Sequence, residues 1–192
     1  MNPFHRRRVR WSGRSAIPAW RVRNAHERLL PGITLDAVKP LFATLGSPQD
    51  RMWPGTAWSP MILDRLLANG ASGGHGRIRY TCTAYLPGRF AEFTFDSVNG
   101  NVIDGRHVLE AVPRHAGVLL RHTLDLECSA SDWIKLKALV IPAHDAVVEQ
   151  LLDNIERSIT GTAAHPHRWR LRVLLIRRLF GLSTTMAPWS GT

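Results

Sequence analysis

The sequence has little of what would mark a secreted, membrane-spanning or disulfide-stabilised protein. Its 192 residues include only two cysteines, Cys82 and Cys128. Two cysteines suit neither a zinc-ligand spacing nor a secreted disulfide scaffold. No stretch reaches the roughly 18 consecutive apolar residues of a transmembrane helix, and the basic N-terminus lacks the apolar run of a secretory signal. We therefore expect a cytoplasmic protein with one domain, since 44% hydrophobic residues suffice for one sizeable core.

Acidic residues are missing from both ends of the chain. Residues 1–24 contain seven arginines and residues 161–192 contain five, with no Asp or Glu in either segment. The middle of the chain holds the other thirteen basic residues and all fifteen acidic ones, so the positive formal net charge of +10 comes from the two ends. The central domain is therefore not a basic platform, and nucleic-acid binding by it is not expected. We expect a basic, disordered extension over 1–24, a domain over 25–161 and a basic, partly apolar extension over 162–192.

The C-terminal extension permits three interpretations. Its stretch "HRWRLRVLLIRRLFGL" is basic and apolar, but the arginines are scattered around the helical wheel. It could lie on an anionic membrane as a peripheral contact, dock on the domain or a partner, or stay loosely ordered.

The central part of the chain alternates apolar and polar residues, as half-buried antiparallel strands do. A short strand is predicted over 25–32, and further strands over 77–85, 90–95, 105–112 and 119–128. One or two short helices are expected over 34–46, where Thr34 can cap and Pro40 can interrupt. The stretch "GASGGHG" before the second strand lacks the Lys-Ser/Thr ending of a phosphate loop. We interpret it as a loop whose glycines allow a bulge or a close approach. His75 could sit at the mouth of a cavity, but we expect a solvated loop residue.

A long helix is predicted over 132–160, capped by Ser129 or Ser131, kinked or restarted at Pro142 and ended by Gly161. Its apolar face would cover the sheet. The fold class is therefore α+β, with a curved antiparallel sheet under a long C-terminal helix.

Three histidines fall on the faces that should be covered. His107 and His122 share the apolar sides of their strands, and His144 lies on the apolar side of the helix. A strand parity shifted by one residue would instead send His107 outward next to Arg106. A single inward histidine is usually a core group bonded to a carbonyl or carboxylate. Three would cost roughly 1–3 kcal/mol each if unpartnered, so they favour an internal cavity that holds water or a ligand.

These residues suggest acid–base chemistry. A neutral His122 or His144 can move protons at physiological pH, and Asp145 could orient one ring. Tyr80, inward on its strand, could donate to an enolate or simply pack as an aromatic side chain. Three histidines and a carboxylate could instead hold zinc or iron, but no local His-x-x-x-His supports this, so we expect no metal and no cofactor. No Gly-x-Ser-x-Gly turn is present, so covalent catalysis is not expected.

Five stretches in order carry a resemblance to a known family: "RMWPGTAWSPM", "GGHGRIRYTCTAYLPGRFAEFTF", "DGRHVLEAVPR", "LLRHTLDLE" and "PAHDAVVEQLLDNIER". Over about residues 25–160 the chain resembles actinobacterial members of the SRPBCC superfamily, the START-like or Bet v 1-like group that includes polyketide cyclases and dehydratases. The resemblance implies a helix-grip fold with an apolar cavity. Arg106 stands where the resemblance leads us to expect an aromatic residue before the histidine.

The resemblance also implies a function. Such proteins bind lipids, sterols, polyketides or other apolar molecules, and some catalyse cyclisation or dehydration without a cofactor. We expect His122, His144, Asp145 and Tyr80 to carry any catalysis. The ligand would lie against the inward side chains of the same strands and helix, namely His107, Ile78, Phe93, Phe95, Leu109, Leu124, Val148 and Leu151. Two alternatives stay open: a non-enzymatic carrier or sensor, and a binder of nucleic acid or anionic membrane that acts through its tails.

Overall fold

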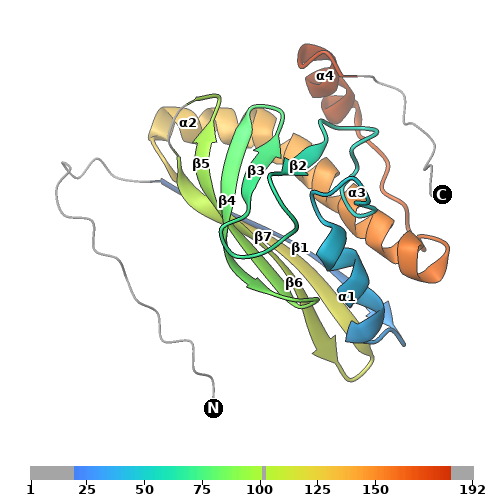
Figure 1. The fold of residues 1–192 in the computed structure, drawn as a ribbon. Coiled ribbons are helices and arrows are strands. Elements are labelled where there is room, and N and C mark those ends of the chain that lie inside the picture. Colours follow the sequence, from blue (N-terminus) through green and yellow to red (C-terminus); the bar gives the residue numbers. More distant parts are fainter. Residues whose placement is uncertain (1–19, 101–102, 183–192) are drawn as a thin grey trace.

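Seven antiparallel strands form one curved sheet in the computed structural model, which describes residues 20–100 and 103–182 (Figure 1). The order across the sheet is β1-β7-β6-β5-β4-β3-β2. The strands are β1 (Trp20–Pro31), β2 (Met61–Leu63), β3 (Ser72–His75), β4 (Ile78–Leu86), β5 (Phe90–Val98), β6 (Asp104–Arg114) and β7 (Gly117–Cys128). The long C-terminal helix lies across one face of this sheet (Figure 1). The predicted α+β class and the arrangement of sheet and helix are confirmed.

Strand β7 shows why the sheet has a covered and an open face. Its buried positions alternate strictly with less buried ones, and they are Val118, Leu120, His122, Leu124 and Leu126. A strand turns successive side chains to opposite faces, so these residues all point toward the helix. The pairing of β7 with β6 sets His107 opposite Leu124 and Leu109 opposite His122. The inward direction predicted for these strands is confirmed.

Strand β1 begins at Trp20, five residues before the predicted start at 25, and it pairs with β7 along its whole length. Residues 20–24 are therefore part of the sheet and not of a disordered extension. The rest of the predicted N-terminal extension, residues 1–19, lies outside the described residues. Residues 24, 26 and 28 lie between the buried Val22 and Leu30 on the inner face of this strand, and all three are polar.

The glycine-rich stretch forms strand β3 between β2 and β4, where we predicted a loop. A Cβ on Gly73 would lie 2.0 Å from the Ile62 carbonyl oxygen, and one on Gly74 would lie 1.9 Å from that of Ile78. The expected close approach of backbones is thus confirmed. The sequence pattern missed the strand because glycine has low strand propensity and gives no alternation to read.

The long helix has three consecutive parts: α2 (Ala130–Lys135), a π-helical turn η1 (Leu136–Val140) and α3 (Ile141–Thr160). Ser129 caps the start by accepting a hydrogen bond from the Asp132 amide, and Gly161 ends it with a φ of 83°. Pro142 has no amide hydrogen to donate one turn back, and its ring crowds that turn. The chain accommodates it with the wider π turn just before α3 rather than with a break.

Helix α1 (Leu35–Thr44) packs at one end of the sheet as a single helix, although Pro40 lies inside it (Figure 1). Its inner side contributes Val38, Leu41 and Phe42 to the main core. Thr34 holds the N-cap position, but its side chain makes no cap hydrogen bond.

The C-terminal segment docks on the domain, which was one of the three interpretations of its sequence. The amide of His167 donates to Asp153 Oδ2 at 2.6 Å, and helix α4 (Leu171–Leu179) packs against α3. Val173 of α4 shares a small core cluster with Trp58 and Ala146. Helix α3 is thus covered by the sheet on one side and by this segment on the other (Figure 1).

Within the part of the chain that the structure describes, we find no helix that combines the length and the apolar character needed to cross a bilayer.

Candidate functional site

The three inward histidines form a row between the sheet and α3. The ring centroid of His122 lies 5.6 Å from that of His107 and 5.1 Å from that of His144. His122 is buried, while His107 and His144 are partly buried. Residues from β6, β7 and α3 therefore meet as the alternation of the two strands and the helical spacing predicted.

Tyr80 extends this row on the β6 side. Its ring is fully buried and its centroid lies 4.9 Å from that of His107. Phe93 stacks on His107 at 5.0 Å, with only 11° between the two planes, and its centroid lies 5.2 Å from that of Tyr80. The Tyr80 hydroxyl is buried and finds no hydrogen-bond partner among the residues described. This is an unpaired polar atom within a buried cluster of phenyl and imidazole rings.

Burial keeps the imidazoles of the row neutral. It lowers the pKa of His107 to about 3 and holds those of His122 and His144 well below the ordinary value of 6.5. Neutral imidazoles can accept a proton at physiological pH. The Nδ1 atoms of His122 and His144 are buried without a partner among the described residues. Burial also raises the pKa of Tyr80, so its hydroxyl stays protonated and can donate a hydrogen bond.

His26 on β1 was not predicted as a site residue, yet it lies at the other end of the row. Its ring centroid is 6.2 Å from that of His144. Its Nδ1 lies 2.7 Å from Glu149 Oε1 and its Nε2 lies 3.1 Å from Asp145 Oδ1. Burial opposes its protonation, but the hydrogen bonds to the two carboxylates outweigh that effect and raise its pKa to about 9. A cationic imidazole therefore stands beside a neutral one.

Asp145 has a different partner from the one expected. We predicted that it would orient an inward histidine of the row, and instead it binds His26 and accepts from Asn24 Nδ2 at 3.0 Å. Burial would raise its pKa, but the hydrogen bond from His26 outweighs this and lowers it. Asp145 is thus an ionised group at the edge of the site, with 39% of its side chain exposed.

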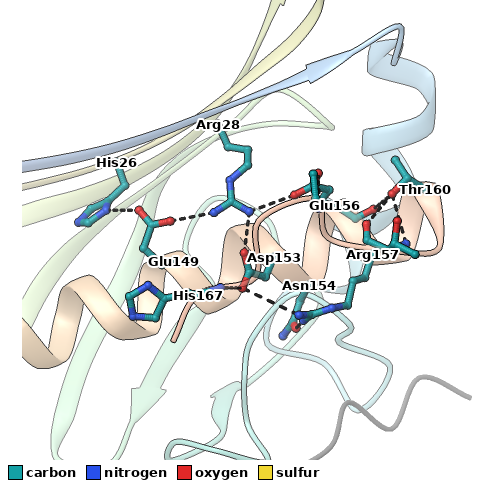
Figure 2. A network of polar contacts seen from close by, with 11 residues as sticks. His26, Arg28, Glu149, Asp153, Asn154, Glu156, Arg157, Thr160 and His167 are labelled. Carbon is teal, nitrogen blue, oxygen red and sulfur yellow. Dashed lines mark hydrogen bonds and ion pairs between the residues drawn. The ribbon is translucent and has the colours of Figure 1, made fainter. Parts of the chain in front are cut away.

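An ion-pair network continues from His26 along β1 and α3 (Figure 2). Arg28 donates to Asp153 Oδ1 at 2.6 Å, to Glu156 Oε2 at 3.0 Å and to Glu149 Oε2 at 2.8 Å. Glu149 joins the two cations, because its other oxygen binds His26. The network fixes the part of β1 that carries His26 against the acidic residues Glu149, Asp153 and Glu156 of α3.

One group in the site could hold a metal ion. His26, His144 and Asp145 each offer a ligand atom, and these atoms lie within 4.8 Å of one another. Two imidazoles and a carboxylate are a common ligand set for zinc and iron. An ion here would have to displace the proton of His26, which both carboxylates stabilise. The geometry permits a metal without requiring one.

His75 is not the solvated loop residue that we predicted. Its ring centroid lies 4.6 Å from that of Trp53 and 6.0 Å from that of Tyr80. Burial lowers its pKa to about 4. It belongs to the group of aromatic rings at the Tyr80 end of the row. Its burial was not predicted because the sequence pattern did not identify strand β3.

The apolar side chains predicted to line the ligand fall in two neighbouring clusters. Phe93, Leu109, Val148 and Leu151 belong to the main core, and Leu124 belongs to a second cluster. Phe95 packs against both clusters, and Ile78 packs against the first.

A hollow of about 350 Å³ lies on the open face of the sheet, between β1, β5, β6 and β7. Its lining includes the ion pairs Arg21–Asp125 and Arg106–Glu92. This charged lining does not suit an apolar molecule. It is not the internal cavity that we predicted between the sheet and the helix, and that cavity stays a prediction.

Comparison with known proteins identifies the fold. No family model and no curated sequence matches the chain. Among solved structures, a protein from Thermobifida fusca determined by NMR is 17% identical with a TM-score of 0.55, covering 78% of this chain and 99% of that one. Truncated norcoclaurine synthase from Thalictrum flavum is 9% identical with a TM-score of 0.53, covering 76% and 98%. At such identities the likeness concerns the fold alone, and that fold is the Bet v 1-like helix grip.

Proposed function

We propose that this protein binds a small, largely apolar molecule between the sheet and helix α3, and that the row of imidazoles acts on a carbonyl or hydroxyl group of that molecule. One observation carries the proposal. The Tyr80 hydroxyl and the Nδ1 atoms of His122 and His144 belong to one continuous row of rings from β4, β6, β7 and α3, and all three atoms are buried without a protein partner among the described residues. Each unpaired buried group costs roughly 1–3 kcal/mol, a cost that a polar group on a bound ligand would remove.

The arrangement supports cofactor-independent acid–base catalysis, such as cyclisation or dehydration through an enol. His122 or His144 would take a proton from the carbon beside a carbonyl, and the electron pair would move to the carbonyl oxygen. Tyr80 would donate a hydrogen bond to that oxygen. The cationic His26 lies beside the neutral His144, but both of its ring nitrogens are bonded to carboxylates, Nδ1 to Glu149 and Nε2 to Asp145. We therefore assign His26 and Asp145 the role of an ion pair that positions the His144 end of the row. In a dehydration, the imidazolium formed in the first step would return its proton to the hydroxyl group, which leaves as water.

A carrier or sensor without turnover is the second candidate. It is favoured by the close packing of His107 against the rings of Phe93 and Tyr80, at 5.0 and 4.9 Å, which suits a binding wall more than a mobile catalyst. The fold is compatible with catalysis as well, because one solved structure that shares it is named as a synthase.

The test begins with native mass spectrometry of the purified full chain, which would reveal a co-purifying molecule and its mass. That molecule is then titrated into the wild type and into variants with His122→Ala and His144→Ala, while chromatography of the mixture measures turnover. We expect each substitution to weaken binding or turnover at least about tenfold. His115→Ala, in an exposed hairpin loop, is the matched control.

The outcomes separate the candidates. Recovery of the ligand chemically unchanged, with affinity lost in the variants, favours the carrier. Affinity and turnover that both survive the loss of His122 and His144 would overturn the proposal.

A further inference from the structure

Helix α4 packs on the domain with one face. Its opposite face packs against none of the residues that the structure describes. Val173 and Ile176 on the inner face are 5% and 3% exposed. The outer face carries a leucine stripe, Leu171, Leu175 and Leu179, with exposures of 73%, 56% and 76%. Residues four apart lie above one another on a helix, so the stripe is continuous. Exposed apolar surface of this extent on an ordered helix is typical of an interaction site.

The inner face holds α4 rigidly in place. The Arg177 guanidinium lies over the rings of Trp58 and Trp169, at 4.5 and 3.8 Å from their centroids, and its Nη1 donates to the Ala57 carbonyl at 2.6 Å. Arg172 Nη2 donates to the Ala138 carbonyl at 2.6 Å and so ties the start of α4 to the π turn. The leucine stripe is therefore presented on a fixed support and does not depend on a loose tail.

Positive charge surrounds the stripe. The exposed cations of the segment are Arg168, Arg170, Arg172 and Arg178, and residues 161–182 contain no acidic residue. Arg172 and Arg178 flank the stripe along the helix. The nearby π turn adds Lys137 and the exposed Leu139 and Val140, which are 40% and 37% exposed. Because Arg177 is buried, the exposed arginines of α4 are the two that flank the stripe, Arg172 and Arg178.

We propose that the outer face of α4 docks on the surface of a bilayer that contains anionic phospholipids, with the leucine stripe in the interface and the arginines on the headgroups. An amphipathic helix with leucines on one face and arginines beside them binds in this way, through apolar burial and attraction to anionic lipid. Nucleic acid would use the arginines but leave the leucines unburied. The proposal goes beyond the binding of an internal ligand and does not depend on it.

Docking would place α4 between the bilayer and the first half of α3. Helix α4 packs where Ala143, Ala146 and Val147 lie, whereas His144 of the same turns contacts His122 and His26 of the sheet. The proposed membrane contact is therefore on the other side of α3 from the histidine row.

Cosedimentation of the full chain with vesicles tests the proposal. We compare vesicles of phosphatidylcholine alone with vesicles of equal parts phosphatidylcholine and phosphatidylglycerol, at low and high salt. Binding to the anionic vesicles should weaken with salt, and binding to the neutral ones should be at least about tenfold weaker. Leu171→Ser with Leu175→Ser should lower the partition coefficient about tenfold or more.

The controls use exposed apolar side chains elsewhere. Ile62→Ser and Leu66→Ser remove residues that are 64% and 70% exposed, and they should leave vesicle binding unchanged. The leucines of the stripe face outward, so a circular-dichroism melt should show both pairs of variants folded.

Three results would overturn the proposal. They are no sedimentation with anionic vesicles, equal sedimentation with neutral vesicles, and binding that falls with salt but ignores the leucine substitutions, which would assign it to the arginines of the chain ends alone. Light scattering of the same samples would show self-association through the stripe if vesicles do not bind.

Discussion

Replacing Arg28 by methionine tests what the network between β1 and α3 contributes to stability. The guanidinium contacts Asp153, Glu156 and Glu149 at 2.6, 3.0 and 2.8 Å. The side chain of Asp153 is only 2% exposed, so water cannot take the place of the lost cation. Removing one partner of a buried ion pair costs about 3–5 kcal/mol, because the remaining charge stays buried without compensation.

The structure points to the lower end of that range. Asp153 keeps the amide of His167 at 2.6 Å and the Arg157 guanidinium at 4.0 Å. We therefore expect Arg28→Met to lower the free energy of unfolding by about 3 kcal/mol. For a chain of this size, 1 kcal/mol corresponds to a Tm change of about 2–4 °C, so Tm should fall by about 6–12 °C. Urea unfolding at pH 7, followed by circular dichroism, measures the free energy directly.

The matched control is Arg21→Met on the same strand. Arg21 pairs with Asp125 on the open face and its side chain is 63% exposed. An exposed ion pair contributes about 0–1 kcal/mol, so this variant should unfold almost like the wild type. Equal losses in the two variants would refute the reasoning, since burial would then make no difference to the value of the pair.

The pH dependence of stability should follow the histidines. Because the pKa of His26 is raised from 6.5 to about 9, the stability that its proton brings is complete below pH 6.5 and is lost as pH rises to about 9. Below pH 6.5 stability should instead fall as pH falls. The pKa of His107 is lowered to about 3 in the folded protein, so the unfolded chain takes up the proton first. Urea titrations across pH should therefore show a maximum near neutrality, and His26→Gln should abolish the alkaline decline; a decline that persists in this variant would contradict the assignment. Separately, Gly74→Ala should cost about 3 kcal/mol or more in a thermal melt, because its φ is 156° and its Cβ would lie 1.9 Å from the Ile78 carbonyl oxygen. Gly32→Ala has a positive φ of 71° but open space around it, so it should cost only about 1 kcal/mol, and a loss equal to that of Gly74→Ala would exclude the clash as the cause.

The row of imidazoles could be predicted because the strands that carry it alternate without interruption. A shift of one residue in β7 would turn Leu120, Leu124 and Leu126 to the open face together with His122, at a large cost in buried apolar surface. Only one direction of the strand was therefore reasonable. The helix placed His144 by the same argument, through its spacing from Val148 and Leu151.

His26 could not be found in this way. The inner face of β1 carries Asn24, His26 and Arg28 in succession, so the strand has no apolar alternation at its centre. The sequence feature that indicates a partner for His26 lies in another element. Asp145, Glu149 and Asp153 repeat every four residues along α3 and so form one acidic stripe. The polar residues of β1 and the acidic residues of α3 are partners, but this becomes clear only when the strand and the helix are placed side by side. A sequence analysed one element at a time does not show which elements are neighbours.

The double covering of α3 has a consequence for how such a chain can change over time. In a domain where the long helix has one free side, segments after it can be gained or discarded with little effect on what precedes them. Here a chain shortened to Thr160 would take away the amide donors that reach Asp153 and Glu156 and would uncover Ala146, which packs with Val173. Helix α3 and the basic segment after Thr160 therefore depend on each other. A homologue without that segment should carry a more polar outer surface on this helix.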